Sequence, residues 1–126
     1  MPTRELGTET FPGTPESARA ARRWLTERLG SAHPAHDDAV LLLSEAVTNS
    51  VLHSTGGKVE VSVLLDEQAV RVEVVDEGGD TLPHYVDDPC GEGGRGLPIM
   101  RALASEWGYE LVERGLKVWF TVRPLR

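Results

Sequence analysis

Residues 43–54 read Leu-Ser-Glu-Ala-Val-Thr-Asn-Ser-Val-Leu-His-Ser, a stretch that carries both an apolar and a polar pattern at helical spacing. The pattern around it predicts a helix that begins near Asp37 and runs to about Ser54, where a pair of glycines at positions 56 and 57 stops it. Four apolar residues recur at helical spacing and predict its buried face: Ala39, Leu43, Ala46 and Val47. We therefore expect one side of this helix to pack into the core.

A column of polar residues lies on a different face of the same predicted helix. Glu45, Asn49 and His53 are spaced by four residues, so they stack along the helix at about 100° per residue. Asparagine is unfavourable within a helix because its short amide competes for backbone groups, so its presence needs a reason. Three leucines flank the column: Leu41, Leu42 and Leu52. This arrangement indicates the wall of a cleft, and the alternative is an ordinary solvated face.

The other elements follow from the spacing of apolar residues. Two further helices are expected, over 14–29 with Thr14 as N-cap and Gly30 at its end, and over 97–107 with Gly108 just after it. Alternation predicts strands at 8–11, 59–65, 70–74, 111–112 and 116–122, with a hairpin turn at 66–68. Together they predict an α+β two-layer sandwich, with helices on one face of a mixed, mainly antiparallel sheet.

Asp76 stands where a valine strand ends. Counting by twos from Val70, Val72 and Val74 places it on the same face of the sheet. If that face is the core face, the carboxylate lies at the edge of the interior and needs a hydrogen-bond donor. Gly78 would let the backbone come close to a flat group. The alternative is a common strand-ending Asp-x-Gly turn.

Residues 77–95 form a long stretch without periodicity, which in a compact domain indicates a binding loop, a lid or disorder. The run 91–97 then carries four glycines, at positions 91, 93, 94 and 96, and opens a helix. Backbone N–H groups at such a turn, beside the positive end of a helix dipole, suit a phosphate group. A flexible connector is the alternative. No Gly-Lys-Ser/Thr follows, which excludes a P-loop, and no strand directly precedes it, as a Rossmann fingerprint requires.

Composition narrows the class of protein. The 126 residues suit one domain, and 20 acidic against 13 basic residues give a net charge of −7. This charge argues against nucleic acid or an anionic membrane as a direct partner. Without an apolar run long enough to cross a bilayer, a cytoplasmic location is expected. A metal or redox protein using Cys90 and four scattered histidines (33, 36, 53 and 84) is a remote alternative, because their spacing matches no ligand pattern.

The order of these features resembles the ATP-binding superfamily of gyrase, histidine kinases and mismatch-repair ATPases (GHKL), with its Bergerat fold. It looks most like the small stand-alone branch, the bacterial anti-sigma-factor serine/threonine kinases and their actinobacterial relatives. The motifs that carry the resemblance are residues 43–54, 74–78 and 94–97, supported by Trp107-Gly108 and residues 118–120. The likeness extends from Phe11 to Phe120, so residues 1–126 are expected to form a single domain with an ATP lid at 77–95. Residues 1–7 could be disordered.

The resemblance implies a role for each matching residue. Asn49 would ligate Mg²⁺ on the nucleotide phosphates, and Asp76 would accept a hydrogen bond from the adenine amino group, with Gly78 beside the base. Glu45 would orient or deprotonate the attacking hydroxyl group as the catalytic residue. The phosphates would lie against the third motif: Gly94, Arg95, Gly96 and Leu97. Asp80 and Glu92 depart from the glycines of the family pattern, which adds acidic side chains near the phosphates.

The function implied is a cytoplasmic ATP-binding regulator of anti-sigma type. It would phosphorylate a serine or threonine of a STAS-type anti-anti-sigma partner and would sequester a sigma factor. A homodimer is compatible with this family. The alternative is a non-catalytic module in which nucleotide binding orders the lid and sets the affinity for a partner.

Overall fold

The computed structural model describes residues 3–53, 57–77, 103–113 and 115–124. Within these ranges two helices follow the first strand and four more strands complete the order. The elements are β1 (Arg4–Pro12), α1 (Ser17–Leu29), α2 (His36–His53), β2 (Lys58–Asp66), β3 (Ala69–Asp76), β4 (Glu106–Val112) and β5 (Gly115–Val122).

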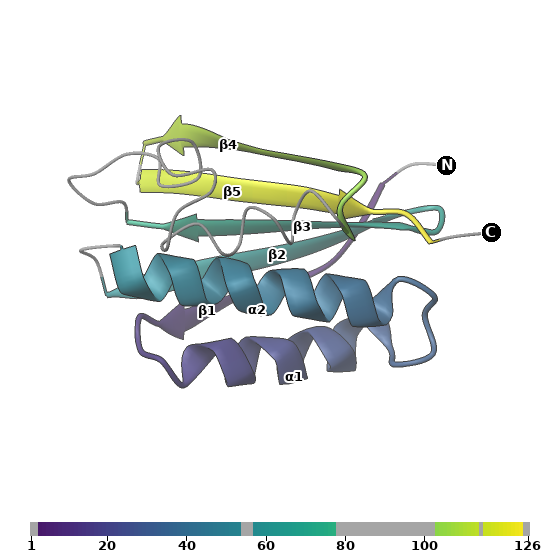
Figure 1. The fold of residues 1–126 in the computed structure, drawn as a ribbon, viewed down its shortest axis with the longest axis horizontal. Helices are drawn as coiled ribbons and strands as arrows, with labels where there is room; N and C mark the ends of the chain where they lie inside the picture. The colour runs from purple at the N-terminus through teal and green to yellow at the C-terminus, as the bar shows by residue number, and fades with distance from the viewer. Residues whose placement is uncertain (1–2, 54–56, 78–102, 114, 125–126) are drawn as a thin grey trace.

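The strands form one sheet in the order β1-β2-β3-β5-β4, and both helices lie on one face of it (Figure 1). The α+β two-layer architecture is confirmed. The sheet was expected to be mixed, but each of the four pairings between the described strands is antiparallel. The reason is local, since short connections join β2 to β3 and β4 to β5, and short connections favour antiparallel neighbours.

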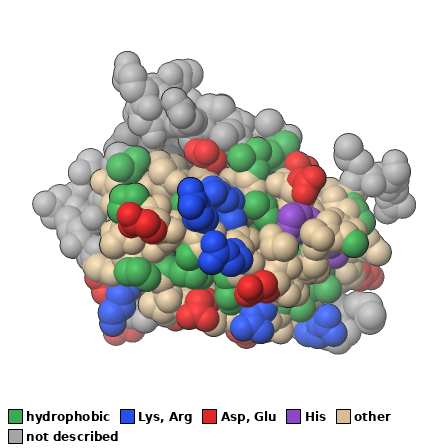
Figure 2. All heavy atoms as spheres, turned by 90° about the horizontal axis from the view of Figure 1, so that it is seen from below, with side chains coloured by type: hydrophobic (Ala, Val, Ile, Leu, Met, Phe, Trp, Pro, Cys, Tyr) green, Lys and Arg blue, Asp and Glu red, His purple; other side chains and the backbone are tan. Residues whose placement is uncertain are grey.

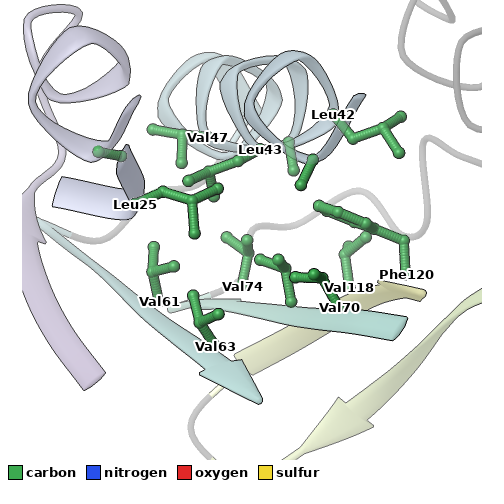
Figure 3. Packing of buried hydrophobic residues seen from close by; sticks show 14 of the residues in the cluster. Leu25, Leu42, Leu43, Val47, Val61, Val63, Val70, Val74, Val118 and Phe120 are labelled. Atoms are coloured by element: carbon green, nitrogen blue, oxygen red, sulfur yellow. The ribbon is translucent and has the colours of Figure 1, made fainter. Parts of the chain in front are cut away.

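The core lies between α2 and the centre of the sheet. The predicted stripe of α2 is fully buried: Ala39, Leu43, Ala46 and Val47. These side chains face valines of β2 and β3 and Phe120 of β5 (Figure 3). Leu42, one of the three leucines that flank the polar column, is fully buried and lies on the side of α2 that faces Phe120 (Figure 3).

The N-terminal elements differ from their predicted bounds. The first strand begins at Arg4 rather than Thr8, because its ladder with β2 extends to Leu65. The first helix begins at Ser17, not at Pro15, and Thr14 does not cap it. The Ser17 hydroxyl instead donates to the Pro12 carbonyl oxygen, and the Ser17 N–H donates to the Thr14 carbonyl oxygen over 2.9 Å, which closes a turn before the helix. Gly30 ends α1 as predicted, with φ 92°.

Trp107 was expected in the third helix and lies instead in β4, opposite Phe120 of β5. Its spacing of four from Leu103 imitates a helix, but Trp107, Tyr109 and Leu111 also alternate along the chain. Pairing with β5 buries the first two of these against the core, and so the two-residue period prevails. The remainder of the predicted third helix, apart from its end near Leu103, lies outside the described residues.

Candidate functional site

The side of α2 that faces away from α1 carries the polar column. Ser44 marks the side that faces α1, because its hydroxyl oxygen accepts a hydrogen bond of 2.8 Å from Arg22 Nη1. Asn49 follows Leu42 by seven residues, or about two turns, so both residues lie on the side toward Phe120 of β5. Glu45 and Asn49 are half-buried, one turn apart. They therefore stand on the side of α2 that faces away from α1.

Asp76 is the last residue of β3, and its side chain lies on the helix-covered face, as the count by twos predicted. It is 6% exposed, close to the values of the valines that precede it. Its register partners are Val59 of β2 and Leu116 of β5, both buried. A carboxylate in such apolar surroundings is costly unless a donor meets it.

The chain path brings Asn49 and Asp76 to the same end of the molecule. α2 ends at His53, β2 begins at Lys58, and Val59 of β2 is paired with Asp76. Figure 1 shows the carboxyl ends of α2 and β3 side by side at the left. α2 also packs on β3, β2 and β5. Glu45 lies one turn farther from this end, about 6 Å along the helix.

Glu77 is a residue at this end that sequence reasoning missed. Its Oε1 accepts a hydrogen bond of 2.8 Å from the Gly57 N–H, and Gly57 O accepts one of 2.9 Å from the Gly13 N–H. These bonds tie the end of β3 to the start of β2 and to the end of β1. The sequence offered one signal for Glu77: it directly follows Asp76, and a side chain at that position can reach the start of the neighbouring strand.

A hollow of about 300 Å³ opens beside these strand ends, lined by Thr10, Lys58, Glu60, Val75, Asp76 and Glu77. Thr10, Glu60 and Val75 are register neighbours on the helix-free face of the sheet. Of the predicted site residues that the structure describes, only Asp76 lines it. The hollow therefore opens on the helix-free face of the sheet, whereas Glu45 and Asn49 belong to α2 on the other face.

His33 and His36 lie at the connection between α1 and α2, at the opposite end of α2 from Asn49. His33 Nδ1 accepts a hydrogen bond of 3.0 Å from the Ala35 N–H, and His36 Nε2 is 2.8 Å from Thr26 Oγ1. Burial lowers the pKa of His33 below 6.5, and the neighbouring His36 adds to this. Both rings are used in holding the connection. In the described part of the chain no three His, Cys, Asp or Glu residues are grouped as metal ligands.

The remaining predicted site residues lie outside the described residues. They are Gly78, Gly94, Arg95, Gly96 and Leu97, together with the lid at 77–95 beyond Glu77. The same holds for Cys90, His84, Asp80 and Glu92.

Comparison with known proteins gives a family. Residues 11–122 match the histidine kinase-like ATPase domain. The serine-protein kinase RsbW of Bacillus pumilus is 32% identical over 118 residues, which cover 76% of this chain and 72% of that protein. RsbW of Bacillus subtilis is 30% identical over 114 residues, covering 75% and 71%. No described helix is long and apolar enough to span a membrane. With the match running from β1 through β5, this chain belongs to the family of histidine kinase-like ATPase domains.

Proposed function

We propose that this chain is a cytoplasmic regulator of anti-sigma type that binds ATP with Mg²⁺ and phosphorylates a serine or threonine of a STAS-type anti-anti-sigma protein. In its unphosphorylated form that protein would compete for the chain with a sigma factor. The family supports ATP binding. The relatives' name, serine-protein kinase, supports the class of reaction.

One observation carries the proposal: a half-buried carboxylate and a half-buried amide stand one turn apart on α2, and the end of that helix lies at the same end of the molecule as the buried carboxylate of Asp76. Asp76 is suited to accept a hydrogen bond from the adenine amino group, since a buried carboxylate recognises a donor strongly. The adenine ring would then lie against the end of β3. This orients the phosphates toward α2.

Asn49 fits a magnesium site. Its side-chain oxygen is the hard donor that Mg²⁺ accepts beside water and phosphate oxygens, and the residue is half-exposed on α2. When bound, Mg²⁺ supplies charge neutralisation to the phosphate groups. Gly94, Arg95, Gly96 and Leu97 are proposed to hold the phosphates through backbone N–H groups, with Gly78 beside the base.

Glu45 is proposed as the general base. The acceptor oxygen of serine forms a bond to the γ-phosphorus while the bond from that phosphorus to the β,γ-bridging oxygen breaks, and ADP leaves. The hydroxyl proton passes to the Glu45 carboxylate. Positioning and charge stabilisation account for most of the catalysis in such a transfer, so a single carboxylate is sufficient as the base.

The test is incubation with γ-labelled ATP and purified STAS-type proteins. Wild type should label a serine or threonine of one of them. Glu45→Gln should lose about 10²- to 10⁴-fold in rate while keeping its thermal shift with ATP. Glu27→Gln, which changes an exposed glutamate of α1, is the matched control and should label at the wild-type rate.

Labelling by Glu45→Gln at the wild-type rate would exclude Glu45 as the base. If wild type labels nothing but binds a STAS-type protein only with ATP, the kinase proposal fails. The non-catalytic, nucleotide-gated module is then the function.

A further inference from the structure

Two leucines of α2 are left exposed by the core. Leu41 is 44% exposed and Leu52 is 69% exposed, whereas the leucines next to Leu41 at positions 42 and 43 are fully buried. Leu41 and Leu52 are eleven residues apart, about three turns, so they lie on the same face of the helix. The distance between them is about 16 Å along the axis.

Glu45 lies on this face between the two leucines. Positions 41, 45, 48 and 52 follow the spacing of one helical stripe, and Thr48 is exposed as well. We call Leu41, Glu45, Thr48 and Leu52 the α2 stripe. Because the buried residues point to the opposite side, the stripe is the outer face of α2. It runs past the carboxylate proposed as the base.

The proposed reaction has two substrates, a nucleotide and an acceptor protein, and the stripe suits the protein better. The phosphates of a nucleotide are highly polar and gain nothing from exposed leucines. A protein that brings a hydroxyl group to Glu45 must cover the helix for several ångströms on both sides. It would therefore contact Leu41 on one side and Leu52 on the other. Apolar side chains repeated along one helix face are typical anchors of a protein interface.

Positive charge lies beside the stripe. Arg22 of α1 lies on the α1 side of the stripe, where its Nη1 donates a hydrogen bond to Oγ of Ser44, which is not itself part of the stripe. Arg19 lies one turn before Arg22, and both line a hollow of about 340 Å³. Figure 2 shows Lys and Arg side chains gathered in the middle of the face seen from below, with hydrophobic and acidic side chains around them. In a chain of net charge −7 this local reversal favours a partner with acidic groups at its rim.

We propose that the α2 stripe is the docking surface for the protein that accepts the phosphoryl group. The acceptor places apolar side chains on Leu41 and Leu52 and its hydroxyl group between them, near Glu45. This inference rests on the proposed function. It adds the surface that selects a protein substrate over a small alcohol.

The experiment compares Leu41→Gln, Leu52→Gln and the double variant with wild type, using a STAS-type protein that wild type labels. Glutamine keeps nearly the helix propensity of leucine, so folding should be preserved. Each substitution should raise KM for the acceptor protein about tenfold, since the loss of one apolar anchor costs about that factor. The double variant should reach about a hundredfold, because sites this far apart add. The kcat and the thermal shift with ATP should stay unchanged.

Leu111→Thr is the control, because Leu111 is 63% exposed but lies in the edge strand β4 rather than on α2. Its KM should equal that of wild type. An unchanged KM in the double variant, or an equal rise in Leu111→Thr, would overturn the docking surface while leaving the kinase in place. Loss of the ATP shift would assign the leucines to nucleotide binding and would also overturn it. If wild type labels no STAS-type protein, the proposed function fails and this inference fails with it.

Discussion

Trp119 of β5 covers Gly108 of β4 on the helix-free face of the sheet. The two residues are register partners, and a Cβ built on Gly108 would lie 2.8 Å from Cζ2 of the indole ring. The ring is held from the other side by Arg71, whose guanidinium carbon is 4.3 Å from its centroid. Glu73 accepts a hydrogen bond of 2.8 Å from Arg71 Nε and is 3.7 Å from Lys117 Nζ. The indole therefore has little room to move.

Gly108→Ala should lower the free energy of unfolding by about 1–3 kcal/mol, because the new methyl group overlaps a ring that cannot swing away. Denaturant unfolding followed by tryptophan fluorescence measures the change. Gly57→Ala is the matched control, since a Cβ at Gly57 meets nothing within 4 Å. Equal stabilities of the two variants would contradict this account of Gly108.

Asp76→Asn should weaken ATP binding by about tenfold to a hundredfold, because a hydrogen bond to a charged acceptor contributes about 1.5–3 kcal/mol. Isothermal calorimetry gives the affinity, and circular dichroism checks that the buried substitution leaves the fold intact. Asp66→Asn, at the exposed end of β2, controls for the change in net charge. The same dissociation constant in both variants would mean that Asp76 does not contact the base.

Asn49→Ala should lose the part of the ATP-induced thermal shift that depends on Mg²⁺. A ligand stabilises the folded state by mass action, so weaker metal binding reduces the shift in proportion to the logarithm of affinity. The shift measured with ATP and excess chelator should match that of wild type. Thr48→Ala, an exposed neighbour on the same helix, should behave like wild type in both conditions. If Asn49→Ala keeps its full response to Mg²⁺, then Asn49 does not bind the metal.

An element could be predicted from the sequence where its apolar residues repeat often enough to fit either a helix or a strand, but not both. The buried stripe of α2 and the alternation ending at Asp76 each extend over several repeats, and both were predicted correctly. Trp107 was assigned wrongly because one four-residue spacing competed with a two-residue alternation. Only the pairing with Phe120, a contact distant in the sequence, decides between them.

The candidate site shows the same limit. The order of the polar residues pointed to one crevice, and the chain path from α2 to β2 does bring Asn49 and Asp76 to one end of the molecule. The bond from Gly57 to Glu77 could not be predicted, because it joins two loop positions whose approach depends on the register of β2 and β3.

His33 makes stability depend on pH. Burial lowers its pKa from 6.5, and its Nδ1 can accept the Ala35 N–H only while that nitrogen carries no proton. Since the folded pKa lies below the unfolded one, the unfolded chain binds the proton more readily. The contribution of neutral His33 is therefore complete above pH 6.5 and is lost as the pH falls from there through the folded pKa.

His33→Asn removes the titration but keeps a side-chain acceptor for the Ala35 N–H, as in an Asx turn. Its free energy of unfolding should fall less steeply than that of wild type as the pH is lowered below 6.5. Urea unfolding across this range measures both curves, and parallel curves would show that His33 is not the group responsible.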